Sequence, residues 1–403
     1  MHELDKEAAN KKTEGLTDDQ DVDLNSYTDT LKEYSYVNDL AGIDPADSKQ
    51  MLKVGVDTAG NDRVATFIQK DSSVIHCKTK QDGVEVMGIS EAVRKYDWLQ
   101  DYLWKGVDPD TDKYTHQAKD KPHEGYFIRV LPGVKAIHPI QSCLYIAKEG
   151  SAQNVHNIVI AEEGSELHII TGCATAPHVV EGLHVGVSEF YVKKGAKLTF
   201  SMIHNWGKEV AVRPRTVSYV EEEGVLVSNY ISLGHIRTLQ MYPTTYLNGK
   251  GAVARFSSIL IAPAGSHLDI GSRIILNAPE THAEIISRAI TTGGTIIARG
   301  SLAGMFPGVK GHLECKGLIL SDGLMHAIPE LEGHVAGVEM SHEAAVGKIA
   351  REEIEYLMAR GLDEDEAIST IVRGFLNVDI EGLPPSLKKE LDAAVAESEK
   401  DMF

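Results

Sequence analysis

Side chains that could bind iron or accept sulfur gather in one stretch of the sequence, GHLECKGLILSDGLMHAIPELEGHVAGVEMSHEAAVGK. Thiolate, imidazole and carboxylate groups are the side chains that hold iron in proteins, and a thiolate also accepts sulfur. A lone cysteine in a β-rich core is, however, usually a small buried apolar residue, and a lone histidine is usually a hydrogen-bonded surface group. Residue types alone therefore leave a metal site and ordinary packing both open for His312, Cys315, His326, His334, His342 and Glu343.

The chain contains four cysteines, and none of them forms a Cys-x-x-Cys pair. Their wide spacing argues against disulfides and against a zinc or iron–sulfur site built from clustered cysteines of one chain. Any metal must then be held by residues far apart in the sequence, or by two chains together. Cys173 lies in TGCATAP, between an expected strand and a turn, where a buried apolar thiol is the simpler interpretation, and Cys77 and Cys143 are assigned to packing.

Composition narrows the class of protein. The 403 residues include 42% hydrophobic and 25% charged residues, which is ordinary for a globular protein. A formal net charge of −19 disfavours binding to nucleic-acid backbones. No apolar run reaches the roughly 18 residues of a membrane-spanning helix, and the N-terminal MHELDKEAANKKTEG lacks the apolar core of a signal peptide. We therefore expect a cytoplasmic protein.

Several catalytic motifs are missing from the sequence. It contains no GxxxxGKS/T phosphate-binding loop, no GxGxxG after a strand, no HExxH and no GxSxG. The chain is therefore not expected to bind or hydrolyse nucleotide by these routes. If ATP drives its function, a partner protein must hydrolyse it.

Residues 1–122 are expected to form a mixed, partly helical region. The polar and acidic N-terminal segment could be frayed or could form a helical arm. The later segment SEAVRKYDWLQDYLWKG has apolar residues at helical spacing. It predicts an amphipathic helix whose apolar side chains are Val93, Trp98, Leu99, Tyr102 and Leu103.

Residues 123–339 are expected to form a β core. Short β-branched runs such as NIVIAEEGSELHIITG alternate with glycine-containing turns, and no helical period persists. The turn glycines Gly164, Gly195 and Gly224 lie 31 and 29 residues apart. Such spacing favours a β-solenoid, whose stacked coils bury one another, over a β-sandwich with Greek-key connections. A left-handed hexapeptide solenoid is disfavoured because no six-residue Val/Ile period occurs.

Residues 340–403 change to a helical period and are expected to form a small helical domain. In SHEAAVGKIAREEIEYLMARG, an apolar stripe predicts a helix that ends at Gly361. A second helix is predicted over LDEDEAISTIVRGFLN, with acids in its first turn. A third is predicted over PPSLKKELDAAVAESEKDM, with Pro385 and Ser386 near its start.

The stretch SHEAAVGKIAREEIEYLMARGLDEDEAISTIVRGF strongly resembles the signature of the SufB/SufD family, the scaffold proteins of the SUF iron–sulfur cluster assembly system. The matching residues are His342, Ala344, Val346, Gly347, Lys348, Ile349, Glu352, Glu353, Tyr356, Leu357, Arg360, Gly361, Gly374 and Phe375. Two upstream segments, TGCATAP and EGLHVGVSEFYVKKGAKLTFSMIHNW, are similar to further landmarks of the family. These landmarks fall at Cys173, Pro177, Leu183, His184, Asn205 and Trp206.

The resemblance implies a mainly β fold, with a right-handed parallel β-helix core, an N-terminal α/β region and a C-terminal helical domain. It implies that two cores dimerise and that a SufC-like ABC-type ATPase docks on the C-terminal helices. The chain resembles SufB in Cys315 and Glu343, while SHEAAVG is also close to the SufD-type histidine motif. One chain with both features suggests a homodimer in place of a pair formed with a SufD-like paralogue.

The resemblance also implies roles for individual residues. The cysteine matching Cys173 receives sulfur from a donor and passes it inward, and the cysteine matching Cys315 accepts sulfur and belongs to the cluster site. The residues matching His342 and Glu343 sit beside that thiol near the dimer interface. Cys315, His342 and Glu343 are thus the expected metal and cluster ligands. Two copies would build a transient 4Fe–4S or 2Fe–2S cluster at their two-fold interface and pass it to apo-protein acceptors.

Two other functions remain open. A SufD-like structural partner without its own cluster would have no need of Cys315. A β-solenoid enzyme acting on polysaccharides would bring carboxylates together on a solvent-facing strand and would work without iron.

Overall fold

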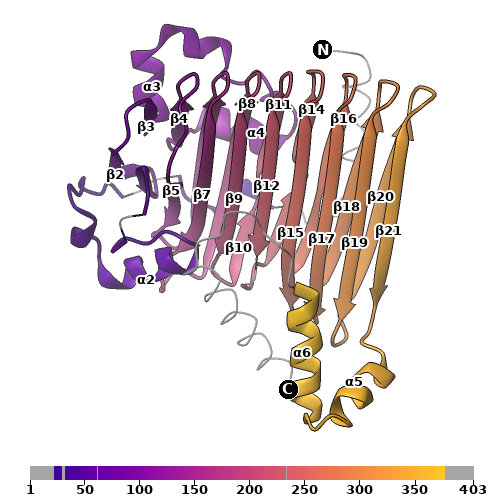
Figure 1. Cartoon of the computed structure of the whole chain (residues 1–403). Helices are drawn as coiled ribbons and strands as arrows, with labels where there is room; N and C mark the ends of the chain where they lie inside the picture. Colours follow the sequence, from indigo (N-terminus) through magenta and orange to yellow (C-terminus); the bar gives the residue numbers. More distant parts are fainter. Residues whose placement is uncertain (1–21, 30–31, 61, 233, 377–403) are drawn as a thin grey trace.

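The computed structural model of the chain describes residues 22–29, 32–60, 62–232 and 234–376. Its main feature is a parallel β-solenoid of about eight turns (Figure 1). This confirms the prediction of a mainly β fold built around a solenoid. The alternative of a β-sandwich was wrong.

Two long sheets form the solenoid, and each coil contributes to both. All strand pairs are parallel except β1 with β2 and β3 with β4. Sheet I contains, in spatial order, β2 (Ser73–Thr79), β1 (Ala65–Lys70), β5 (Ile140–Ile146), β7 (Glu166–Thr175), β9 (Lys197–Asn205), β12 (Val225–Ser232), β15 (Val253–Pro263), β17 (His282–Thr292), β19 (Lys310–Ile319) and β21 (Glu339–Gly347). Sheet II contains β3 (Val84–Gly88), β4 (Tyr126–Val130), β6 (Ser151–Ala161), β8 (Glu181–Val192), β10 (Glu209–Val212), β11 (Arg215–Val220), β13 (Thr238–Met241), β14 (Thr244–Leu247), β16 (His267–Leu276), β18 (Thr295–Gly304) and β20 (Leu324–Gly333).

The coils are stacked in register. Cys315 pairs with Ser287, and Ser287 pairs with Ser258, which are steps of 28 and 29 residues along the chain. These steps match the near-regular spacing that the turn glycines predicted. Because partner side chains in a parallel pair point to the same face of the sheet, each coil repeats the pattern of inward and outward side chains of its neighbour.

The turn before each of the later sheet I strands contains one residue in the left-handed backbone region, usually glycine. Gly195 has φ of 64°, and an added Cβ would meet no atom within 4 Å. Gly224 differs, because Glu223 takes the left-handed position with φ of 54°. Gly224 is needed for space instead, since its Cβ would lie 2.9 Å from Cγ1 of Val220. The left-handed residues of this row are Gly164, Gly195, Glu223, Gly251, Glu280, Gly308 and Gly337.

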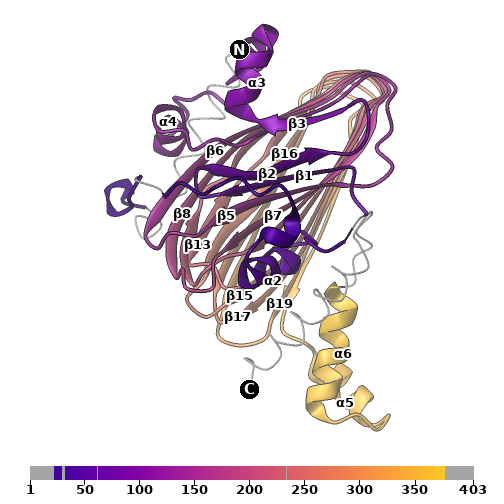
Figure 2. The same ribbon diagram turned by 90° about the vertical axis from the view of Figure 1, so that its left-hand side faces the viewer.

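The N-terminal region closes one end of the solenoid (Figure 2). Its short helices are η2 (Leu24–Ser26), η3 (Leu40–Gly42), α2 (Pro45–Lys53), α3 (Ile89–Lys95), η4 (Asp97–Asp101) and α4 (Lys113–Asp120). The amphipathic helix predicted over residues 90–106 was wrong in its length, because an extended Tyr96 separates α3 from η4. Its apolar side chains are nevertheless packed against Phe127, Ile158 and Tyr191 of sheet II.

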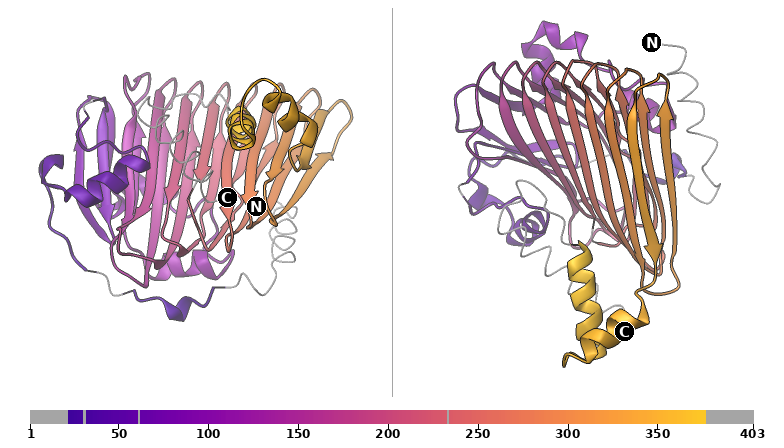
Figure 3. Two further views of the ribbon diagram at one scale, coloured as in Figure 1. Left: turned by 90° about the horizontal axis from the view of Figure 1, so that it is seen from below. Right: turned by 45° about the vertical axis from the view of Figure 1, so that its right-hand side comes forward.

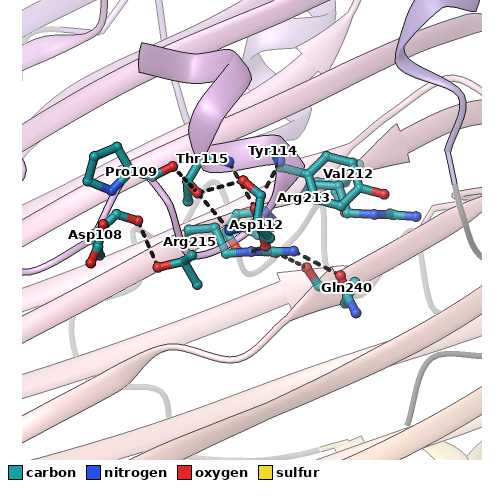
Figure 4. Close-up of polar contacts among 11 residues, drawn as sticks. Asp108, Pro109, Asp112, Tyr114, Thr115, Val212, Arg213, Arg215 and Gln240 are labelled. Atoms are coloured by element: carbon teal, nitrogen blue, oxygen red, sulfur yellow. Dashed lines mark hydrogen bonds and ion pairs between the residues drawn. The ribbon is translucent and has the colours of Figure 1, made fainter. Parts of the chain in front are cut away.

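Helix α4 is joined to sheet II by a partly buried ion pair (Figure 4). Oδ1 of Asp112 caps α4 by accepting the N–H groups of Tyr114 and Thr115, each at 2.9 Å. Its Oδ2 accepts a bond from Nε of Arg215 at 2.6 Å, and Arg215 also donates to Oε1 of Gln240 at 2.9 Å. Burial alone raises the pKa of Asp112, but the guanidinium and the N–H donors outweigh it and lower the pKa. The carboxylate therefore stays ionised and joins the N-terminus of α4 to Arg215 of sheet II.

The two C-terminal helices are α5 (Arg351–Met358) and α6 (Glu364–Leu376), and α6 confirms the second predicted helix. Of the two, α6 is packed on the outer face of sheet I, and α5 contacts α6 beyond the ends of the strands (Figure 3). Val372 and Leu376 of α6 are packed against Ile259, Ile261 and Ile290 of the sheet. The third predicted helix, over residues 384–402, lies outside the described residues.

The first predicted C-terminal helix was wrong over residues 341–347. That segment belongs to β21, which pairs with β19 from Glu339 to Gly347. Backbone hydrogen bonds to the preceding coil override the local helical propensity of the sequence HEAAV. The two sheets thus extend into segments that the sequence assigned to the flanking regions, with β1–β3 on one side and β21 on the other. The division into 1–122, 123–339 and 340–403 stays a prediction.

Among the described residues, no helix is both long and apolar enough to span a membrane.

We predict that Gly195→Ala lowers the free energy of unfolding by about 1 kcal/mol, because alanine is strained in the left-handed region. Gly333→Ala serves as the control, since Gly333 is not left-handed and an added Cβ would lie 3.9 Å from Val338 Cβ. Urea denaturation of both variants measures the difference. An equal loss of unfolding free energy in the two variants would contradict the requirement for a left-handed residue at Gly195.

Candidate functional site

Cys315 lies in β19 with its side chain inside the solenoid. Alternation along the strand turns Leu313 and Cys315 inward, and Cys315 is only 1% exposed. Burial raises the pKa of the Cys315 thiol from 9.0 to about 11, and the charge of Glu314 contributes to the rise. The thiol is therefore protonated at neutral pH, and it needs a base, a metal or an opening of the site to become a nucleophile.

Polar side chains lead from Cys315 into the interior. Cys315 stacks on Ser287, Ser287 on Ser258, and Ser258 on Tyr230. Oγ of Ser258 donates to Oγ of Ser287 at 3.1 Å. These serines and Tyr230 line a cavity of about 50 Å³, together with apolar side chains such as Met202. A small molecule or ion could occupy this cavity, since a water needs only roughly 10–15 Å³.

His342 lies at the open end of the solenoid. It is in β21, the last strand of sheet I within the described residues, and it pairs with Leu313 while Ala344 pairs with Cys315. His342 and Ala344 therefore occupy the face of the sheet that points inward in the earlier coils. Both residues are exposed, because no further described coil covers them.

Glu343 points to the opposite face of the same strand. It pairs with Glu314, and Ser341 pairs with His312, so all four belong to the outer face of sheet I. One ligand atom from each of His312, Glu314 and Glu343 lies within 4.8 Å of the others. Nδ1 of His312 is 2.8 Å from Oγ of Ser341, which fixes the plane of the ring.

Two basic side chains neutralise these acids. Nζ of Lys316 lies 2.7 Å from Glu314 and 3.1 Å from Glu343, and Arg288 forms an ion pair with Glu314. Burial raises the pKa of Glu314, but the hydrogen bonds from Lys316 and Arg288 outweigh it and lower the pKa. Glu314 is therefore ionised at neutral pH, although its residue is only 8% exposed.

The fold divides the three residues that the sequence grouped as ligands. Cys315 and His342 belong to the inner face of sheet I, whereas Glu343 belongs to the outer face. Within one chain the three side chains do not converge, so a common site would require two copies or a rearranged terminal coil. The remaining candidate histidines, His326 and His334, lie on or just after β20 of sheet II, away from this strand pair.

Cys173 lies in β7, also inside the solenoid, and is fully buried. It pairs with His204 of β9, whose Nδ1 is 2.8 Å from the hydroxyl of Tyr230. Burial raises the pKa of Cys173 and lowers that of His204, so both groups are neutral. Within the described residues, Nε2 of His204 is buried without a hydrogen-bond partner. His204, on the strand beside Cys173, therefore has a ring nitrogen that is available for a further hydrogen bond.

The two interior thiols are far apart. Five strand spacings of sheet I, through β9, β12, β15 and β17, separate β7 from β19. At roughly 4.8 Å a spacing this is about 24 Å. Cys77 and Cys143 lie on β2 and β5, on the other side of β7, and offer no intermediate thiol.

Sequence reasoning missed Glu314, Ser287, Tyr230 and His204 as neighbours of the candidate residues. Glu314, Ser287 and His204 each lie one coil from Glu343, Cys315 and Cys173 along the chain, and Tyr230 lies three coils before Cys315 in the same row of pairs. Aligning the sequence on a period of 28 to 31 residues would have found them, because that period is the coil length. The turn glycines contained this signal.

We predict that the Cys315 thiolate forms in the folded protein with a midpoint near pH 11, against 9.0 for an unperturbed thiol. A raised folded pKa stabilises the fold below the unfolded pKa, so this contribution is present below pH 9.0 and is lost as the pH rises towards 11. The difference in thiolate ultraviolet absorbance between wild type and Cys315→Ser isolates this group. A midpoint at or below pH 9.0 would contradict the environment described.

Comparison with known families gives one match that covers more than half of the chain. The family model described as "SUF system FeS cluster assembly, SufBD core domain" matches residues 144–375. The matched region includes Cys173, Cys315, His342 and Glu343, all of α5, and α6 up to its penultimate residue.

Individual relatives agree with this match. An iron–sulfur cluster assembly SufBD family protein of Methanothermobacter thermautotrophicus (strain Winter) is 49% identical over 390 residues, which are 95% of each chain. One from Archaeoglobus fulgidus is 50% identical over 358 residues, 89% of this chain and 96% of the relative. The iron–sulfur cluster assembly protein SufB of Bacillus subtilis is 31% identical over 365 residues, 87% of this chain and 78% of the relative. The chain therefore belongs to the SufBD family of iron–sulfur cluster assembly proteins.

Proposed function

We propose that this chain is a cytoplasmic scaffold on which iron–sulfur clusters are assembled de novo and from which they pass to apo-proteins. The observation that supports this most is the position of Cys315. Its thiol is buried but lies only one strand from the open end of the solenoid, where His342 is exposed. Such a thiol is shielded from oxidation and side reactions, yet among the described residues only the last coil would separate it from a partner at this end.

The open end is the proposed dimer interface. Within the described residues, β21 is the edge of sheet I and β20 is the last strand of sheet II. Edge strands of this kind pair readily with another chain. Exposed apolar side chains accompany the edge, including Leu324, Leu331, Val335 and Val346. Two copies meeting there would bring two Cys315 thiols and two His342 side chains together, which supplies the ligands that one chain lacks.

Sulfur is proposed to enter at Cys173. Exchange between a thiol and a persulfide needs contact between the two sulfur atoms, and about 24 Å separates Cys173 from Cys315. A persulfide on Cys173 therefore cannot react directly with Cys315 of the same chain. We infer that two external thiols reduce the persulfide. The first attacks the sulfur of Cys173, breaks its bond to the outer sulfur, which leaves as hydrosulfide, and forms a mixed disulfide; the second restores the Cys173 thiol and leaves as a disulfide with the first. The sulfide then crosses the interior past Tyr230, Ser258 and Ser287, which line the cavity.

The C-terminal helices are the proposed dock for a SufC-like ABC-type ATPase. Tyr356 and Met358 of α5 are 58% and 37% exposed, and a docked partner would cover them. Helix α6 is packed on the outer face of β15 and β17, close to the last coils. A movement of α5 and α6 that follows ATP binding in the partner would therefore reach the strands that hold the site.

The two alternatives are weaker. A purely structural SufD-like partner does not account for a cysteine at position 315 aligned with an interior polar row. The carboxylates of Glu314 and Glu343 do converge on the outer face, as a polysaccharide-cleaving enzyme would require. Both acids are, however, ion-paired with Lys316, and the family to which the chain belongs assembles iron–sulfur clusters.

We predict that Cys315→Ala lowers the amount of bound cluster about tenfold or more, because a proposed thiolate ligand of the cluster is lost. The chain is purified anaerobically with its ATPase partner, supplied with iron and sulfide, and examined by visible absorbance. Cys77→Ala is the matched control, since Cys77 lies on β2 at the other end of sheet I. His342→Ala should also weaken cluster binding, and unchanged absorbance in Cys315→Ala would remove the assignment.

We predict that Cys173→Ser abolishes persulfide labelling at this position when a sulfur donor is present, and that it slows cluster formation with that donor. Formation from free sulfide should be unaffected, because sulfide bypasses the entry thiol. Cys143→Ser is the control, since Cys143 is a buried thiol on the adjacent strand β5 but pairs with Gly172, which places it on the opposite face of sheet I from Cys173. Mass spectrometry of trapped persulfides gives the readout, and equal total labelling in wild type and Cys173→Ser would exclude the entry role.

A further inference from the structure

We propose that the outer face of the last two strands of sheet I binds a divalent transition-metal ion between His312, Glu314 and Glu343. The inference rests on the proposed function only for the identity of the ion, which would be the ferrous iron destined for the cluster. This site is distinct from the Cys315 thiol, which lies on the inner face of the same strand.

The geometry of three neighbouring positions supports the site. Glu314 and Glu343 are register partners on adjacent strands, and His312 lies two residues before Glu314 on the same face. Their ligand atoms already lie within 4.8 Å of one another. Small rotations of the side chains would bring the atoms to the roughly 2.0–2.2 Å bonds that such ions need. Nδ1 of His312 lies 2.8 Å from Oγ of Ser341, so Nε2 is the ligand atom in this proposal.

The ligand types select the class of ion. Two carboxylates alone would suit calcium or magnesium, but an imidazole favours Fe²⁺, Mn²⁺, Co²⁺ or Zn²⁺. No thiolate takes part, so the site does not hold the ion as a cysteine-rich structural site would. Three protein ligands leave coordination positions open for water and for a group that removes the ion. A site with these ligands can bind an ion and release it again to an acceptor.

Lys316 occupies the place of the cation when no metal is bound. Its Nζ bridges the two acids, at 2.7 Å from Glu314 and 3.1 Å from Glu343. The side chain is partly exposed, at 29%, and is long enough to swing into solvent when an ion enters. Arg288 can keep its ion pair with Glu314 throughout. Competition with Lys316 keeps the affinity moderate, which suits an ion that must be handed on.

Placing iron and sulfur on opposite faces of β19 separates the two reactants. Glu314 points outward and Cys315, the next residue, points inward. Ferrous ion and sulfide precipitate together readily, so a strand between them prevents reaction until the terminal coil opens. They can meet only around the edge strand β21, where His342 and Glu343 are consecutive residues on opposite faces.

The test is metal binding to the full chain, stripped of metal and without sulfide. Anaerobic calorimetry with Fe²⁺, and the visible absorption of Co²⁺, should show a single ion per chain. His312→Gln and Glu343→Gln should each weaken binding about tenfold or more. Lys316→Met should strengthen it about tenfold, because the competing ammonium is gone. Glu339→Gln, on the same strand and face but paired with Lys310 at 3.2 Å, should leave the affinity unchanged.

The outcomes separate this inference from the proposed function. Absence of binding in both wild type and Lys316→Met would overturn the site. Equal binding of Mg²⁺ or Ca²⁺, or binding that survives Glu343→Gln, would overturn it too. If Cys315→Ser abolishes Co²⁺ binding, the ion sits at the thiol, and the outer site is wrong while the scaffold function stands. If the outer site behaves as described but Cys315→Ala still assembles full cluster, only the proposed thiol role fails.

Discussion

The register between parallel coils is the constraint on which the rest of this structure depends. Each residue of sheet I is hydrogen-bonded beside the residue one coil earlier, so its row and its face are both fixed. Because side chains alternate, a slip of one residue would turn every side chain of a strand to the other face. Such a slip in β19 would expose Cys315 and bury the charges of Glu314 and Lys316, which the interior does not tolerate.

The architecture was predicted well, because the spacing of the turn glycines equals the length of one coil. Gly164 and Gly195 mark left-handed positions that few other residues adopt, and their spacing is the coil length. The second C-terminal helix, α6, was also predicted, since its apolar stripe and acidic first turn are local features. The predictions that were wrong concern residues 341–347 and the helix interrupted at Tyr96. In both places contacts with distant segments decide the conformation, and a local period does not report them.

The candidate site was predicted residue by residue but not in its arrangement. Cys315, His342 and Glu343 were identified by resemblance, and nothing in a motif tells which face of a strand each residue takes. That information comes from the pairing of β21 with β19, which also introduces Glu314 and Lys316 as neighbours of Glu343. The same reasoning applies to His204, whose relation to Cys173 exists only because β7 and β9 are adjacent. The division of the candidate residues between two faces therefore follows from the strand register, which the motifs alone do not give.

The uncovered last coil has a further consequence for cooperativity. In a solenoid the stability of each coil is approximately a sum over its nearest neighbours. Within the described chain, β21 has one neighbouring strand in its sheet, whereas β19 has two. Its backbone amides should therefore exchange with solvent through local fraying long before the interior coils open. The segment that contains His342 and Glu343 is therefore expected to detach and re-form while the remaining described coils stay folded.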